Sequence, residues 1–189
     1  MKRSWAPLIG MAFFLIGAGT NVVCQEQATA TRIFFGPVMG VEAEIIDPAA
    51  FNTTLQAVYP KTDGTYFPVV TEMGIESSQR IPLGDSKRSL LLHEMFLIAG
   101  LDQNMPVPNV DLLLGYGGPS GFEVGMGPHF SLTAPGGSVK IGASVMYWAG
   151  LTIATHGYTV PIKLTFVPMP SYVNPQIALL VGFSFEAAE

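Results

Sequence analysis

Cysteine and charge are both scarce in this chain. Cys24 is the only cysteine among 189 residues, and Asp, Glu, Lys and Arg together make up 12% of them, about half of the usual share in a soluble domain. A single cysteine excludes a fold held by internal disulfides. From Arg32 onward there are seven basic and thirteen acidic residues, a net charge of −6, so we expect no basic surface for nucleic acid.

Sequence suited to long helices is also missing. The chain contains 21 glycines and 15 prolines, which disfavour helix interiors, although hydrophobic residues reach 49%. The segment 141–162 carries no charged residue, but Gly142, Gly150, Gly157 and Pro161 interrupt it. This segment therefore predicts two strands and a turn rather than a transmembrane helix.

The first thirty residues have the layout of a secretory signal peptide. A positively charged start precedes the uncharged apolar run 5–19, and Ala28-Thr29-Ala30 offers a cleavage site. We therefore expect residues 1–30 to be removed on export, with an earlier cut as the alternative. The remaining residues, 31–189, suit one domain with a full core.

Residues alternate with a period of two along most of the exported chain, which is typical of strands with two unlike faces. Clusters rich in Gly and Pro separate the alternating segments. Eight strands are predicted, at 32–46, 67–81, 89–101, 109–117, 121–133, 138–149, 159–168 and 176–185. The longest connection, 47–65, is expected to hold a short helix.

The two faces of these strands differ in charge. One face is nearly free of charge, whereas the opposite face collects Glu, Lys, Arg and His. A membrane barrel requires this arrangement, because its outer face meets lipid and its lumen is polar. The sequence therefore predicts an all-β fold, an eight-stranded antiparallel up-and-down transmembrane β-barrel. The charged residues expected to form an ion-pair and hydrogen-bond network in the lumen are Arg32, Glu42, Glu44, Glu72, Glu76, Arg80, Glu123, Lys140 and Lys163.

Aromatic residues gather near the predicted strand ends, as in the girdles of membrane barrels. With both termini in the periplasm, the inner girdle would contain Phe34, Phe35, Tyr116, Phe122, Tyr147, Trp148, Tyr158, Phe183 and Phe185. The outer girdle would contain Tyr66, Phe67, Phe130, Phe166 and Tyr172. The pattern predicts a water interface at each end of the barrel.

The last strand carries a resemblance to a known family. Residues 177–185, Ile-Ala-Leu-Leu-Val-Gly-Phe-Ser-Phe, resemble the C-terminal strand of bacterial outer-membrane β-barrel proteins. Segments 121–128 and 161–168 also look like strands of small, uncharacterised barrels of this kind, and the likeness extends over 32–185.

The resemblance implies a place in the outer membrane of a Gram-negative envelope, with the lipid bilayer as a partner. It also implies that the outer-membrane assembly machinery reads the last strand, through Gly182, Phe183 and Phe185. One departure is the tetrapeptide Glu186-Ala-Ala-Glu189, because the family usually ends on the aromatic residue.

No catalytic or metal-binding motif is complete. His93-Glu94 begins like a zinc-protease helix, but Leu97 stands where the second histidine would be. His129 and His156 have no ligand spacing relative to His93, and no Ser–His–acid set can be assembled. We therefore expect no enzyme activity, no cofactor and no metal.

Eight strands enclose just enough room for side chains, which predicts a filled lumen and a structural, adhesive or other role. Two alternatives stay open. A narrow polar path would make the protein a channel for small solutes. A soluble periplasmic barrel or sandwich binding an apolar ligand would instead turn the apolar face inward. The inward residues would then be Val124, Met126, Val139, Ile141, Leu179 and Val181.

Overall fold

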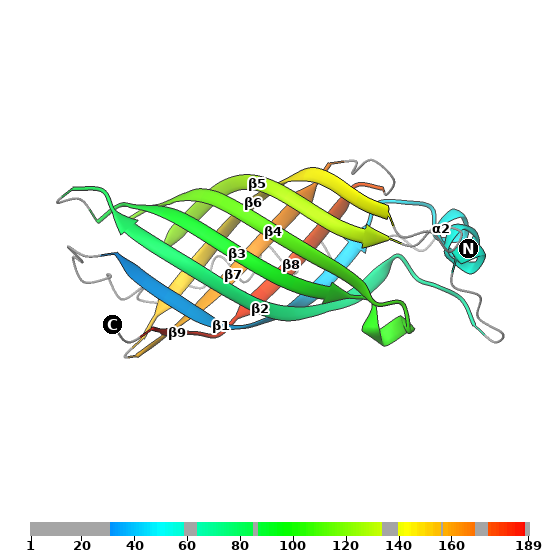
Figure 1. Cartoon of the computed structure of the whole chain (residues 1–189), viewed down its shortest axis with the longest axis horizontal. Helices are drawn as coiled ribbons and strands as arrows, with labels where there is room; N and C mark the ends of the chain where they lie inside the picture. The colour runs from blue at the N-terminus through cyan, green and yellow to red at the C-terminus, as the bar shows by residue number, and fades with distance from the viewer. Residues whose placement is uncertain are drawn as a thin grey trace.

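One sheet closes on itself as a barrel, and a helix lies beyond one end of it (Figure 1). The computed structural model describes residues 31–58, 64–84, 87–133, 140–155, 157–168 and 174–187. The strands are β1 (Arg32–Glu44), β2 (Val69–Pro82), β3 (Ser89–Ala99), β4 (Val107–Gly117), β5 (Phe122–Thr133), β6 (Lys140–Ala154), β7 (Tyr158–Val167), β8 (Gln176–Gly182) and β9 (Ser184–Glu186). The helices are α2 (Pro48–Val58) and the 3-10 helix η1 (Leu101–Gln103).

Neighbouring strands pair antiparallel, and β1 closes the ring by pairing with both β2 and β8. The start of β1 and the end of β9 therefore lie at the same end of the barrel, called here the terminal end. The opposite end, where α2 lies, is called the helix end (Figure 1). A closed ring leaves no unpaired strand edge to meet hydrocarbon. The predicted all-β, up-and-down barrel is confirmed.

β8 and β9 are two parts of one strand. β9 pairs with β1 in the register that β8 sets, with Phe35 opposite Phe185. The ladder is interrupted at Phe183 because prolines, which cannot donate a backbone hydrogen bond, stand beside it on both neighbouring strands. Phe183 N donates to Pro37 O on β1 at 2.9 Å, and Pro161 lies on β7 against Gly182. The ring therefore has eight strands, as the sequence predicts.

Seven strands begin and end within two residues of their predicted bounds, but β6 runs five residues past its predicted end, to Ala154. As a result, Tyr147 and Trp148 lie within the strand rather than at its rim, and Trp148 points into the barrel. Phe34 lies at the terminal end but inside the barrel, and Tyr66 is buried at the helix end. The girdle prediction is wrong for these residues, because strand length and side-chain direction place them elsewhere.

The barrel is apolar outside and largely polar inside. Met39 on the outer face is 62% exposed, whereas Lys163 and Glu123 inside are each 1% exposed. A soluble barrel would bury its apolar face. The soluble alternative is therefore wrong. The soluble alternative requires six apolar residues to point into the barrel. Five of them point outward instead: Val124, Met126, Ile141, Leu179 and Val181. The sixth, Val139, is not among the described residues.

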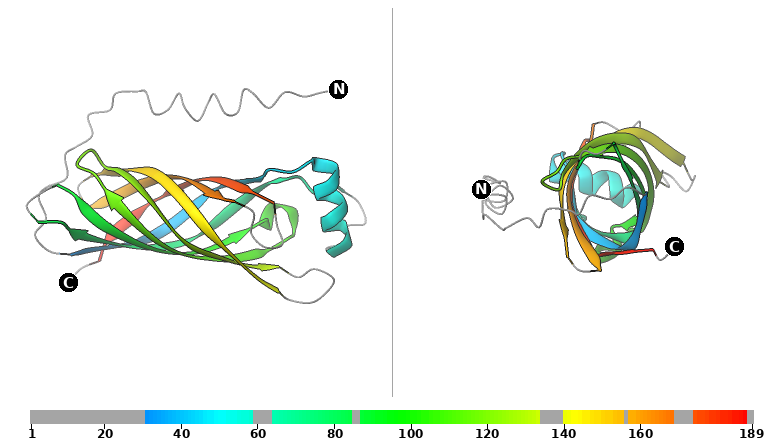
Figure 2. Two further views of the ribbon diagram at one scale, coloured as in Figure 1. Left: turned by 90° about the horizontal axis from the view of Figure 1, so that it is seen from above. Right: turned by 90° about the vertical axis from the view of Figure 1, so that its left-hand side faces the viewer.

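A second hydrophobic cluster occupies the helix end. The connection 47–65 holds the expected short helix, α2, and the Asp47 side chain accepts hydrogen bonds from Ala49 N and Ala50 N at 3.0 and 3.1 Å, as an N-cap does. The cluster consists of Phe51, Tyr66, Val70, Ala99 and Met105, with Ile46, Leu55 and Val107 against it. Viewed along the barrel, α2 projects over its opening (Figure 2). None of the described helices is long and apolar enough to cross a bilayer.

Candidate functional site

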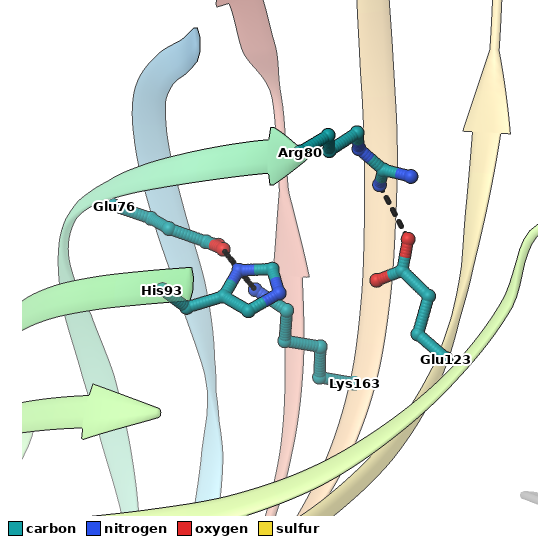
Figure 3. A network of polar contacts seen from close by, with 5 residues as sticks. All are labelled: Glu76, Arg80, His93, Glu123 and Lys163. Carbon is teal, nitrogen blue, oxygen red and sulfur yellow. Dashed lines mark hydrogen bonds and ion pairs between the residues drawn. The ribbon is translucent and has the colours of Figure 1, made fainter. Parts of the chain in front are cut away.

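A buried lysine lies in the interior of the barrel. Lys163 on β7 forms an ion pair with Glu76 on β2, and both side chains are almost fully buried. His93 on β3 places its Nδ1 atom 2.6 Å from Glu76 Oε1 and 3.3 Å from Lys163 Nζ. Figure 3 shows the three side chains converging from separate strands. The cluster therefore ties three strands together across the inside of the barrel.

Trp148 packs beside this cluster. Its ring meets the His93 ring edge-on at 4.8 Å, and Lys163 Nζ lies 5.8 Å from its centre. Gly115 and Gly125, which pair on β4 and β5, leave the space for the indole. A Cβ at Gly115 would lie 2.6 Å from Trp148 Cζ2, and one at Gly125 would lie 2.7 Å from Trp148 Nε1. These glycines therefore let a large ring fill the lumen.

A second ion pair lies nearer the terminal end. Arg80 on β2 pairs with Glu123 on β5 (Figure 3). The Arg80 guanidinium stands 5.7 Å from the centre of the Phe34 ring. At the rim, Arg32 pairs with Glu186, and both side chains are partly exposed. The acidic residue after the last phenylalanine thus joins the end of the chain to its first strand.

The lumen near the helix end is acidic. Asn109 Nδ2 donates to Glu72 Oε1 at 3.2 Å, and His129 Nδ1 lies 2.6 Å from Asp111 Oδ1. Glu42 is buried in the same half of the barrel. Half-buried Glu44 accepts a hydrogen bond from Asn174 at 3.0 Å. Across the residues that the structure describes, no group of three or more His, Cys, Asp or Glu could hold a metal ion.

Apolar side chains also point into the barrel. Their residues form one hydrophobic cluster inside the barrel: Val38, Leu91, Met95, Leu97, Leu113, Met146, Trp148, Val167, Ala178 and Leu180. They come from β1, β3, β4, β6, β7 and β8, so the cluster joins opposite walls. The lumen contains a packed core rather than a continuous polar surface.

The structure brings most of the nine predicted lumen residues inside. Buried there are Glu42, Glu72, Glu76, Arg80, Glu123 and Lys163. Glu44 is half-buried near the helix end, and Arg32 lies at the terminal rim rather than in the interior. Lys140 is the first residue of β6, opposite Thr133, and its side chain lies outside the described part.

The residues of the predicted assembly signal lie at the break between β8 and β9. Phe183 and Phe185 point outward, 39% and 52% exposed, and their rings meet at 5.0 Å. The Phe183 ring also stacks on Tyr158 at 4.6 Å. Gly182 is packed against Pro161, since an added Cβ would lie 2.8 Å from Pro161 Cγ. An aromatic cluster therefore marks the outer surface here, and its role in assembly stays a prediction.

Several polar members of the lumen are absent from the predicted network of nine residues. Histidines were expected on the polar face as a group, but the network did not name His93, His129, Asp111 or Asn109, although all four are at most 2% exposed. Period-two alternation places Asp111 and Asn109 together on the strand face opposite Val110, so their inward direction could have been predicted. Their contacts with Glu72 and His129 depend on strand order and register.

The closed ring, apolar outer face and polar interior define an eight-stranded transmembrane β-barrel of the outer-membrane type. The solved structure of Ail, the attachment invasion locus protein of Yersinia pestis, has a similar fold, with a TM-score of 0.51 and 10% identity over 83% of this chain and 97% of that one. Ail with the heparin analogue sucrose octasulfate gives a TM-score of 0.48 at the same identity and coverage. At this identity the likeness concerns the fold alone. No protein-family model and no curated protein sequence matches the chain.

Proposed function

We propose that the protein is an outer-membrane barrel that is closed to solutes. Its helix end faces the outside of the cell, and the barrel anchors α2 at the cell surface. The observation that carries the proposal is that buried apolar side chains and ion pairs lie together inside the barrel. Leu113, Met95 and Trp148 belong to the hydrophobic cluster inside the barrel, and the ion pairs of Lys163 and Arg80 link strands in the same interior. A role in structure or attachment, rather than in transport or catalysis, fits such a core.

Attachment is the more specific part of the proposal. Phe51 and Tyr66 fix α2 to the barrel through the second hydrophobic cluster. Other helix side chains, such as Ala49 and Thr53, are exposed at the tip. A helix held in one orientation offers a partner a preorganised surface, which lowers the entropic cost of binding. The structurally similar protein Ail is named the attachment invasion locus protein, and we propose a role in attachment for the helix end of this chain as well.

The closed lumen predicts an absence of conductance. The full chain, inserted in a planar lipid bilayer at neutral pH, is expected to show no discrete current steps, whereas a large porin in the same bilayer gives them. Heat-dependent gel mobility of the inserted sample verifies that the barrel is folded. Reproducible open-channel steps from the folded chain would contradict the closed lumen and favour the narrow-channel alternative.

In the proposed orientation the helix end faces the outside of the cell and the terminal end faces the periplasm. This orientation predicts which end a reagent can reach in intact cells. Thr53→Cys on α2 and Lys87→Cys beside the hairpin at the terminal end both place a thiol at an exposed position. A membrane-impermeant maleimide is expected to label Thr53→Cys in intact cells, and Lys87→Cys only after the outer membrane is opened. The unaltered chain, whose one cysteine is Cys24, is the control. The reverse pattern would contradict the proposed orientation.

A further inference from the structure

Apart from tyrosines, the polar side chains on the described outer face of the barrel lie on two neighbouring strands. Among the described outward-facing strand residues, tyrosines aside, the polar ones are Thr71, Ser77, Gln79 and Glu94, all on β2 or β3. Thr71 lies near the helix end, where its hydroxyl bonds to Asp102 at 2.8 Å. The other three form what we call the polar patch, and Glu94 is its charged member.

Glu94 lies at the middle of the apolar outer belt. It is the central residue of β3, with Leu92 and Phe96 as the next outward residues on either side. Its cross-strand partners are Ser77 on β2 and Leu112 on β4. Its side chain is exposed, and among the residues that the structure describes no hydrogen bond to its carboxylate is found.

A carboxyl group in this position is unfavourable next to lipid. Hydrocarbon offers no hydrogen-bond donor, and ionisable residues within membrane-spanning segments are rare and generally have a partner. Ser77 lies directly opposite Glu94, and Gln79 is its diagonal neighbour on β2. The patch therefore contains an acceptor and two donors, and the surrounding surface is aliphatic, with Ile75 and Leu112 exposed.

We propose that the polar patch is the contact surface between two copies of this chain in the membrane. In a dimer with its two-fold axis along the membrane normal, the same patch meets itself. Glu94 of each copy then accepts hydrogen bonds from Ser77 and Gln79 of the other, and the aliphatic residues around them pack together. A second copy fits because the patch is complementary to itself. The inference rests on the transmembrane placement of the barrel but not on its closed lumen or on attachment.

Disulfide formation in lipid vesicles tests the contact. Ile75→Cys places a thiol beside the patch, and Leu164→Cys places one on β7, on the far side of the ring. The full chain carrying Ile75→Cys is expected to form disulfide-linked dimers on mild oxidation, at a yield about tenfold above that of Leu164→Cys. Equal yields from the two variants would overturn the proposal.

Substitutions in the patch test its chemistry. Adding Glu94→Leu to Ile75→Cys is expected to lower the dimer yield about tenfold, whereas Glu94→Gln, which keeps a hydrogen-bond acceptor, retains it. The double change Ser77→Ala and Gln79→Leu removes the donors and is expected to have the same effect as Glu94→Leu. Heat-dependent mobility verifies folding in each case. Folded patch variants that dimerise as well as the parent would overturn the proposal, without bearing on conductance or surface labelling.

Discussion

Replacing Lys163 by methionine is expected to lower the free energy of unfolding by about 3–5 kcal/mol. The substitution leaves the Glu76 carboxylate inside the barrel without its ammonium partner, where the side chains of Lys163 and Glu76 are 1% and 2% exposed. Desolvation of the remaining charge is then no longer offset by the ammonium, and only the contact with His93 is left. Urea unfolding of the chain folded in lipid vesicles, followed by tryptophan fluorescence, measures the loss.

Two controls separate the buried pair from ion pairing in general. Glu186→Gln breaks the pair with Arg32, whose two side chains are 30% and 39% exposed, and is expected to cost at most about 1 kcal/mol. The double change Glu76→Gln and Lys163→Met removes both charges, so most of the lost stability should return. If Lys163→Met unfolds at the same urea concentration as the parent chain, the buried pair contributes no net stability, in contradiction to the expected loss.

Placing lysine at Met126, near the middle of β5, is expected to destabilise the membrane-inserted barrel by about 2–4 kcal/mol. Met126 is 48% exposed on the outer face, so the new ammonium would lie in hydrocarbon. Ile141, although 67% exposed, is the second residue of β6 and lies close to the helix end. Ile141→Lys should therefore cost only about 0–1 kcal/mol.

Vesicle-based unfolding compares the two lysine variants directly, with Met126→Leu as the control for lost methionine packing. A barrel that spans the bilayer makes the penalty depend on depth, because water is available near each interface and absent at the centre. Equal effects of Met126→Lys and Ile141→Lys would contradict the transmembrane placement of the outer face. A destabilised Met126→Leu would show that packing, rather than lipid contact, controls this position.

Strand number and facing were readable from sequence because the side-chain period of a strand is two. Alternation in β1 and β5 separated Met39 and Met126 from Glu42 and Glu123 without any knowledge of their partners. β3 was harder to interpret, since Leu91 and Met95 inside and Leu90 and Phe96 outside are all apolar. An apolar patch within the lumen removes the contrast in polarity between the two faces of the strand.

The rim residues show a different limit. Trp148 was expected in an aromatic girdle because its strand was predicted to end at residue 149, but β6 continues to Ala154. The alternation did predict the side of the strand to which the Trp148 side chain points, since Trp148 shares a face with Met146, and both are buried. The space that accepts the indole depends on Gly115 and Gly125, which belong to other strands.

The sequence by itself determined the membrane-barrel class, the eight strands and the face on which most of the charges lie, because each follows from local alternation and composition. The tertiary structure alone decided which charges meet. Glu76 and Lys163 are 87 residues apart in the chain, and only the order and register of the closed ring bring them together. The same closure brings Arg32 close to Glu186, because β1 pairs with β9. Inside the ring another strand supplies the partner of Lys163, whereas no strand of the same barrel faces Glu94 on the outer wall.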